Sequence, residues 1–221
     1  MESVATFDRT SLPAKGIAAR LWSAARAEFA LRGYHGARVQ GIARRAGCNV
    51  ALLYRHWTSK KALYLEVLRS VWTGKGEAMT AILERGGGAP TVVSAYLEAL
   101  LSDPEGAQIL VREYLDGGPF LSQLMALDPG LVEPVRRAAD VLGRGNGQAL
   151  RPGLDPVLAA LTVGGLAALV SSAAEAARPF TSREVTLDEW RRHLSDLLLN
   201  GLLRCEETGA TGGASGAARG P

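Results

Sequence analysis

The first sixty residues contain three short helical patterns separated by glycines. The first pattern has apolar residues at intervals of four, which places them on one face of a helix: Ile17, Leu21, Ala25 and Phe29. Gly33 predicts its end, because glycine readily takes the left-handed geometry of a helix C-cap. A second helix is expected over 39–46 and ends at Gly47. Asn49 can cap a third helix that runs to residue 57 with Leu53 pointing inward. Two short helices joined by a glycine turn form a helix-turn-helix.

The rest of the chain keeps the helical period of apolar residues, and no run alternates with the period of a strand. Ser59 predicts the start of a fourth helix, which we expect to fade at the glycines around Lys75. The shorter helices expected after it cover 77–84, 91–101, 105–115, 120–126 and 131–142. Two longer ones cover 155–177 and 187–203, with a turn at Pro179 between them. The sequence therefore predicts an all-α fold.

Charge divides the chain unevenly, although its formal net charge is only +3. Residues 1–72 carry twelve basic and four acidic side chains, a formal charge of +8, and the remainder carries thirteen basic and eighteen acidic ones, −5. A basic segment joined to an acidic body is typical of a nucleic-acid-binding module, although a solvated basic face would look the same. The segment 206–221 is rich in glycine and alanine, and we expect a disordered tail there.

Several protein classes find little support. The apolar segment 157–174 reaches only the minimum length for a membrane span and is interpreted as a buried helix. The N-terminus has no apolar leader, so we expect a cytoplasmic protein. Cys48 and Cys205 lie far apart, and His35, His56 and His193 show no metal-ligand spacing. An all-α enzyme is therefore the weaker alternative, and we expect no catalytic site, metal or cofactor.

Three motifs resemble the N-terminal domain of the TetR family of bacterial regulators: FALRGY (29–34), VQGIARRAG (39–47) and LYRHWTSKKAL (53–63). The resemblance covers about fifty residues of the chain and implies a homeodomain-like domain of three helices. In such a domain, the second helix of the helix-turn-helix enters the major groove of DNA. It also implies a homodimer in which each chain has a flexible arm (1–13), a DNA-binding domain (14–73) and a helical effector-binding and dimerisation domain (74–205).

The resemblance assigns roles to individual residues near the DNA. Tyr54 and Lys60 match family positions that contact phosphates, which fix register without reading sequence. Val50 and Leu52 are apolar where the family often has polar or small residues, so base readout would depend on thymine methyl groups and on hydrogen bonds from other side chains. Arg38 replaces the more usual capping threonine. The full set of expected DNA contacts is Arg38, Gln40, Asn49, Val50, Ala51, Leu52, Tyr54, Arg55, His56 and Lys60.

The acidic body is expected to bind a small molecule and to form the dimer. We interpret the helices over 155–177 and 187–203 as a four-helix interface with a second chain, although they could instead only complete the monomer core. The expected effector contacts are Tyr96, Glu113, Tyr114, Phe120 and Met125; an acid such as Glu113 could orient a ligand or simply pair with an arginine. The sequence thus predicts a DNA-binding repressor released by an effector. The remaining alternative is an architectural DNA-binding protein without an effector.

Overall fold

The computed structural model describes residues 16–144, 150–173, 178–181 and 183–202. The expected arm and the glycine-rich tail lie outside these residues. Within them the chain is helical and contains no strand, which confirms the all-α prediction. The elements are α1 (Ile17–Gly36), α2 (Val39–Arg45), α3 (Val50–His56), α4 (Lys60–Leu83), α5 (Ala89–Leu101), α6 (Pro104–Leu115), α7 (Pro119–Leu127), η1 (Pro129–Val132), α8 (Glu133–Arg144), α9 (Pro156–Ala173), α10 (Arg178–Thr181) and α11 (Leu187–Leu202).

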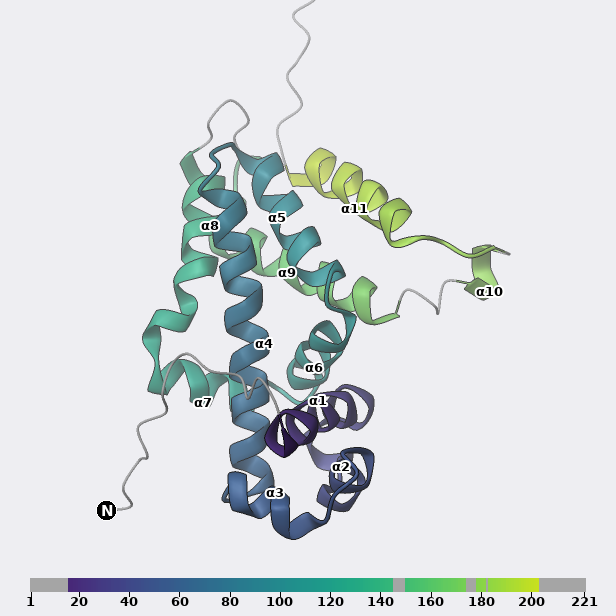
Figure 1. Cartoon of the computed structure of the whole chain (residues 1–221). Helices are drawn as coiled ribbons and strands as arrows, with labels where there is room; N and C mark the ends of the chain where they lie inside the picture. Colours follow the sequence, from purple (N-terminus) through teal and green to yellow (C-terminus); the bar gives the residue numbers. More distant parts are fainter. Residues whose placement is uncertain (1–15, 145–149, 174–177, 182, 203–221) are drawn as a thin grey trace, which may run out of the picture.

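Helices α1 to α3 form a small unit at one end of the molecule (Figure 1). Gly33 has the predicted positive φ of 65°, and a further turn carries the helical segment on to Gly36. The side chain of Asn49 accepts a hydrogen bond from the Leu52 amide at 3.0 Å, and Ser59 caps α4 in the same way. Leu53 and Trp57 are buried as expected. The caps and glycines therefore set α2 and α3 at the geometry of a helix-turn-helix.

Helix α4 is longer than the sequence indicated. The expected fade at residues 74–76 is wrong, because α4 continues through both glycines to Leu83. Each glycine costs about 1 kcal/mol of helix propensity, which the packing of α4 in the body outweighs. Gly76 is needed for close approach, since a Cβ there would lie 2.8 Å from Cγ of Pro134 in α8. One continuous helix thus joins the small unit to the rest of the molecule (Figure 1).

The larger body packs around α5 and α9. Helix α9 contacts α5, α6 and α8, and α11 lies mainly against α5 with a smaller contact to α9. The expected pairing of the last two long helices is therefore only partly present within one chain. Residues of α9 such as Ala160 and Val163 are fully buried, whereas Leu158 and Leu169 are 65% and 51% exposed. The expectation that α9 is buried on all sides does not hold within a single chain.

Helix α6 connects the body to the small unit. Arg112 donates from Nε to the Ala30 carbonyl at 2.8 Å and from a terminal nitrogen to the Leu31 carbonyl at 2.7 Å, near the end of α1. Its neighbour Glu113 is only 1% exposed. The Glu113 carboxylate accepts hydrogen bonds from the Tyr64 hydroxyl of α4 and from two backbone amides at the start of α7, those of Phe120 and Leu121. Glu113 therefore fastens α4, α6 and α7 together.

We predict that Glu113→Ala lowers the free energy of unfolding by about 3 kcal/mol or more, because it leaves three buried donors without an acceptor. Glu113→Gln keeps one amide oxygen for the two backbone donors and should lose about half as much. Urea unfolding followed by circular dichroism measures both. Glu98→Ala, which removes an exposed acid from α5, is the matched control and should change stability by less than about 0.5 kcal/mol. Equal effects of Glu113→Ala and Glu98→Ala would contradict this assignment.

Candidate nucleic-acid interface and ligand cavity

The outer face of α3 is exposed and polar at its edges. Leu53 and Trp57 hold the inner face, and the Trp57 indole nitrogen donates to the Glu66 carboxylate of α4 at 2.6 Å. Tyr54, in contrast, is 50% exposed. The other expected contacts from α3 and its cap are also at the surface, either exposed or half-buried: Asn49, Val50, Ala51, Leu52, Arg55 and His56. Packing of the inner face therefore fixes α3, while its outer face remains available to a partner.

A basic groove lies beside this face, between α1 and α2. Its walls carry Arg32, Arg38, Gln40 and Arg44, and its only acid, Glu28, is buried and pairs with Arg32 at 3.0 Å. Arg38 and Gln40, which the sequence analysis names as expected DNA contacts, are exposed at the start of α2. Arg44 was missed by the sequence analysis. The only sequence signal for Arg44 was the excess of basic residues in the first seventy positions, and that excess does not show which basic side chains are exposed.

Lys60 lies at the start of α4, beside the same surface. Its ammonium group donates to the Ala37 carbonyl at 2.9 Å and lies 4.5 Å from the centre of the Tyr34 ring. Burial lowers the pKa of Lys60 from its ordinary value. The ammonium has three N–H donors, so the bond to Ala37 leaves donors for a phosphate. Lys60 is thus held in place by the chain beside the exposed face of α3.

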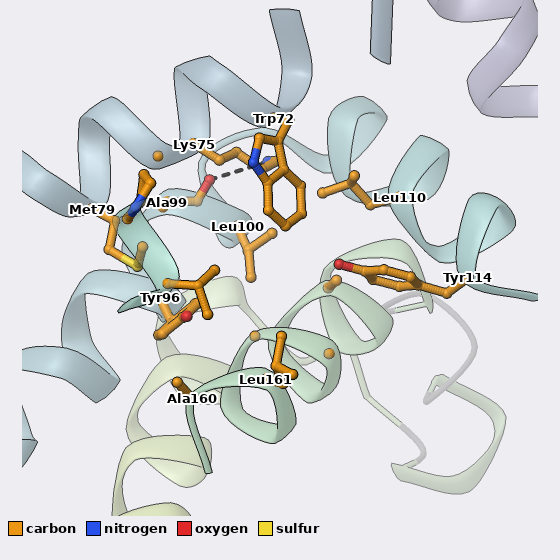
Figure 2. Close-up of a pocket in the computed structure, with 16 residues that line it drawn as sticks. Trp72, Lys75, Met79, Tyr96, Ala99, Leu100, Leu110, Tyr114, Ala160 and Leu161 are labelled. Carbon is orange, nitrogen blue, oxygen red and sulfur yellow. Dashed lines mark hydrogen bonds between the residues drawn. The ribbon is translucent and has the colours of Figure 1, made fainter. Parts of the chain in front are cut away.

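The body contains a cavity between α4, α5, α6 and α9, with Pro134 and Val135 of α8 at its edge. The cavity holds about 60 Å³ and opens to solvent, which is small beside the roughly 300–1,000 Å³ of typical small-molecule sites, so a ligand must be small or must widen it. The lining is mostly apolar and aromatic. Figure 2 shows Trp72 and Met79 on one side, and Tyr114 with its hydroxyl directed toward the space between the lining residues. The cavity is therefore suited to an apolar molecule.

Lys75 brings a charge to the wall of this cavity. Its ammonium group donates to the backbone carbonyls of Ala99 and Asp103 at 3.2 and 3.3 Å, and it lies 3.4 Å from the Asp103 carboxylate. Burial lowers the pKa of Lys75, and Asp103 opposes that shift. Burial alone would raise the pKa of Asp103, but the hydrogen bond from Arg26 and the charge of Lys75 lower it. Arg26 belongs to α1, so the network links the cavity wall to the small unit.

Only part of the expected effector set lines this cavity. Tyr96 and Tyr114 do, whereas Glu113, Phe120 and Met125 do not. Glu113 binds its own chain, and the Phe120 ring packs against Tyr34 and Tyr64. The sequence did not predict the lining residues of α4, because the helix was expected to end near them: Trp72, Lys75, Gly76 and Met79. Trp72 and Met79 lie seven residues apart, two turns of one helix, and this shared face was the signal that could have found them.

Two further properties concern the described part of the chain. No helix in it is long and apolar enough to cross a membrane. It also contains no cluster of three or more histidine, cysteine, aspartate or glutamate side chains placed to hold a metal ion.

Comparison with known proteins identifies the small unit. Residues 21–67 match the family model described as bacterial regulatory proteins of the tetR family. The chain is 32% identical over 95 residues to the transcriptional activator FasR of Mycolicibacterium smegmatis, covering 41% of this chain and 43% of FasR. It is 30% identical over 102 residues to the regulator RutR of Escherichia coli K12, covering 45% of this chain and 48% of RutR. The matched segment thus spans less than half the length of these curated relatives.

Solved structures extend the similarity of fold to most of the chain. The ketosteroid regulator KstR2 of Mycobacterium tuberculosis superimposes with a TM-score of 0.63 at 23% identity, over 83% of this chain and 93% of that one. FadR of Bacillus subtilis, solved with stearoyl-CoA, gives a TM-score of 0.60 at 20% identity, over 82% and 97%. These likenesses concern the fold of most of the chain, while the family model matches residues 21–67. The segment over residues 21–67 is thus similar to the helix-turn-helix of the tetR family of bacterial regulatory proteins.

Proposed function

We propose that this chain is a DNA-binding transcriptional repressor that binds a palindromic operator as a homodimer and is released by a small-molecule effector. The main support for this proposal is the exposed face of α3, whose opposite face is buried through Leu53 and Trp57. The basic groove between α1 and α2 belongs to the same small unit. FasR and RutR, which are 32% and 30% identical to this chain over 95 and 102 residues, are named as a transcriptional activator and a transcriptional regulator. A protein bound at an operator excludes other proteins from the same DNA, and repression is the simplest result.

The proposed roles divide the contacts by chemistry. Tyr54 and Lys60 lie where a hydroxyl and an ammonium can meet phosphates, and Arg38 and Arg55 carry the forked donors that suit guanine. Val50 and Leu52 are half-buried at the start of α3 and would contact thymine methyl groups. The remaining members of the proposed surface are Gln40, Asn49, Ala51 and His56. A regulator of this kind acts on DNA in the bacterial cytoplasm and requires no catalytic step.

We further propose that residues 14–73 act as the DNA-binding domain and residues 74–205 as the effector-binding and dimerisation domain. Helix α4 crosses this boundary, and α6 carries both cavity residues and the Arg112 contact to α1. A ligand that shifts either helix would therefore move the recognition helix. In a dimer, such a movement changes the separation of two helices that must fit major grooves roughly 34–36 Å apart, or a multiple of that distance. The cavity favours this function over an architectural protein without an effector.

The homodimer is supported by the uncovered apolar side of α9. Leu158, Leu161 and Leu169 follow one another along one face of the helix at intervals that a helix brings into line, and all three are exposed. Gly165 lies among them with open space around it, so a second helix could approach closely there. Leu197 of α11 is also exposed. Two copies that cover these faces would form the expected four-helix interface.

Binding to DNA should be specific and strongly dependent on salt. An operator selected from random oligonucleotides should be palindromic, and it should bind at least about a thousandfold more tightly than scrambled DNA. Its affinity should fall steeply between 50 and 200 mM salt, because phosphate contacts release counterions. Fluorescence anisotropy measures both quantities. Equal affinity for operator and scrambled DNA at physiological salt would refute the proposed function.

Two substitutions on α3 should separate affinity from specificity. Tyr54→Phe removes a phosphate donor and should weaken operator and scrambled DNA alike by roughly tenfold, since a hydrogen bond to a charged group contributes about 1.5 kcal/mol. Arg55→Ala removes a proposed base contact and should reduce the ratio between the two affinities. Both side chains are exposed, so thermal unfolding should be unchanged. A Tyr54→Phe variant that altered the ratio, or an Arg55→Ala variant that preserved it, would reverse the assignments.

The oligomeric state tests the α9 face. Wild-type protein should sediment as a dimer at micromolar concentration, and the double variant Leu158→Glu, Leu169→Glu should sediment as a monomer because it places charge in the proposed apolar interface. Leu115→Glu, Leu127→Glu is the control, since it changes two exposed leucines on α6 and α7, which are 81% and 64% exposed. It should remain a dimer. A monomeric wild type, or a control that dissociates like the α9 variant, would exclude this interface.

A further inference from the structure

The Tyr96 hydroxyl is buried in the wall of the cavity without a partner. Tyr96 lies on α5, is only 8% exposed, and its hydroxyl oxygen makes no hydrogen bond with any described residue. The ring is fixed in place, because a Cβ on Gly164 of α9 would lie 2.9 Å from Cε1 of Tyr96. Buried hydroxyls in proteins are nearly always paired, since an unpaired one loses its hydrogen bond to water without replacement. A ligand in the cavity would supply the missing partner.

The hydroxyl is set to donate. Burial raises the pKa of Tyr96, and the nearby phenol of Tyr114 raises it further. Tyr96 therefore stays protonated at every physiological pH and presents an O–H to the cavity. The matching group on a ligand is a hydrogen-bond acceptor, of which a carbonyl oxygen is the simplest.

Charge on a ligand would be poorly matched to the lining. The residues around the cavity include no carboxylate that could pair with a cation, and the ammonium of Lys75 would repel one. An anion would have to compete for Lys75 with Asp103, which stays close because Arg26 and the Gly106 amide also bind it. The Lys75 charge is thus already neutralised within the chain. An uncharged molecule neither needs a carboxylate partner nor has to compete with Asp103 for Lys75.

We infer that the cavity binds an uncharged, mostly apolar molecule with a carbonyl or similar acceptor oxygen, and that Tyr96 donates a hydrogen bond to that oxygen. This inference names the chemical class of the effector and rests on the proposed function for its regulatory meaning. Trp72, Tyr96 and Tyr114 supply aromatic walls (Figure 2). A ring that bears a carbonyl group fits this lining.

Four probes with the same ring test the class: acetophenone, ethylbenzene, benzoate and benzylammonium. Their dissociation constants are measured on the full chain by ligand-observed NMR titration, without DNA. Acetophenone should bind at least tenfold more tightly than benzoate and benzylammonium. Benzoate or benzylammonium binding as tightly as acetophenone, or no binding of acetophenone up to its solubility limit, would overturn the inference.

The variant Tyr96→Phe tests the hydrogen bond. It should weaken acetophenone about fivefold, the typical contribution of one neutral hydrogen bond, and leave ethylbenzene unchanged. Its melting temperature should not fall, because the deleted hydroxyl has no partner in the chain. Tyr34→Phe makes the same chemical change outside the cavity and should alter neither dissociation constant. Equal losses for acetophenone and ethylbenzene, or a lowered melting temperature, would show that the hydroxyl serves the fold and not the ligand.

The ligand class and its effect on DNA binding can fail separately. Repeating the DNA titration with saturating acetophenone asks whether an occupied cavity weakens operator binding. Acetophenone that binds through Tyr96 without changing operator affinity would contradict release by this ligand class and leave the class assignment standing. A charged probe that binds tightly and releases DNA would contradict the class and support the proposed function.

Discussion

The buried charge of Lys75 constrains much of this molecule. An ammonium group that is removed from water needs a compensating charge, and losing that charge would be strongly destabilising. Asp103 supplies it at 3.4 Å while its carboxylate also holds Arg26 and caps α6 through the Gly106 amide. Three helices therefore meet at one carboxylate. This meeting point lies between the cavity and the helix-turn-helix, so neither α4 nor α6 can move without disturbing α1.

The sequence predicted the helix-turn-helix well because local chemistry decides it. Asn49 and Ser59 form the caps that their side chains imply, and Gly33 has a positive φ at a kink, three residues before the helical segment ends. The same local reasoning failed at Gly74 and Gly76, where tertiary packing outweighs propensity. Gly76 serves close contact with Pro134, a reason that depends on a residue far along the chain. Local signals therefore located the proposed DNA surface but hid the α4 wall of the cavity.

Glu113 shows why ligand-binding residues are hard to predict from the sequence. A carboxylate within an apolar helix could serve a ligand, an arginine or the backbone, and the sequence does not distinguish these. The structure pairs it with the Tyr64 hydroxyl and two α7 amides, so it stabilises the fold. Its neighbour Tyr114 reaches the cavity, and Arg112 reaches α1. Successive residues of α6 point to different elements, which only the tertiary arrangement reveals.

This distribution along α6 gives the proposed coupling a physical route. Leu110 and Tyr114 meet the cavity, while Arg112 binds two carbonyls near the end of α1. If two positions of α6 correspond to two placements of the small unit, a ligand that binds one of them more tightly shifts the equilibrium toward it. The size of the shift is set by the difference between its two affinities. Glu113 limits the available movement, because it ties α6 to α4 and to the start of α7. Any displacement of α6 therefore carries α4 and the start of α7 with it.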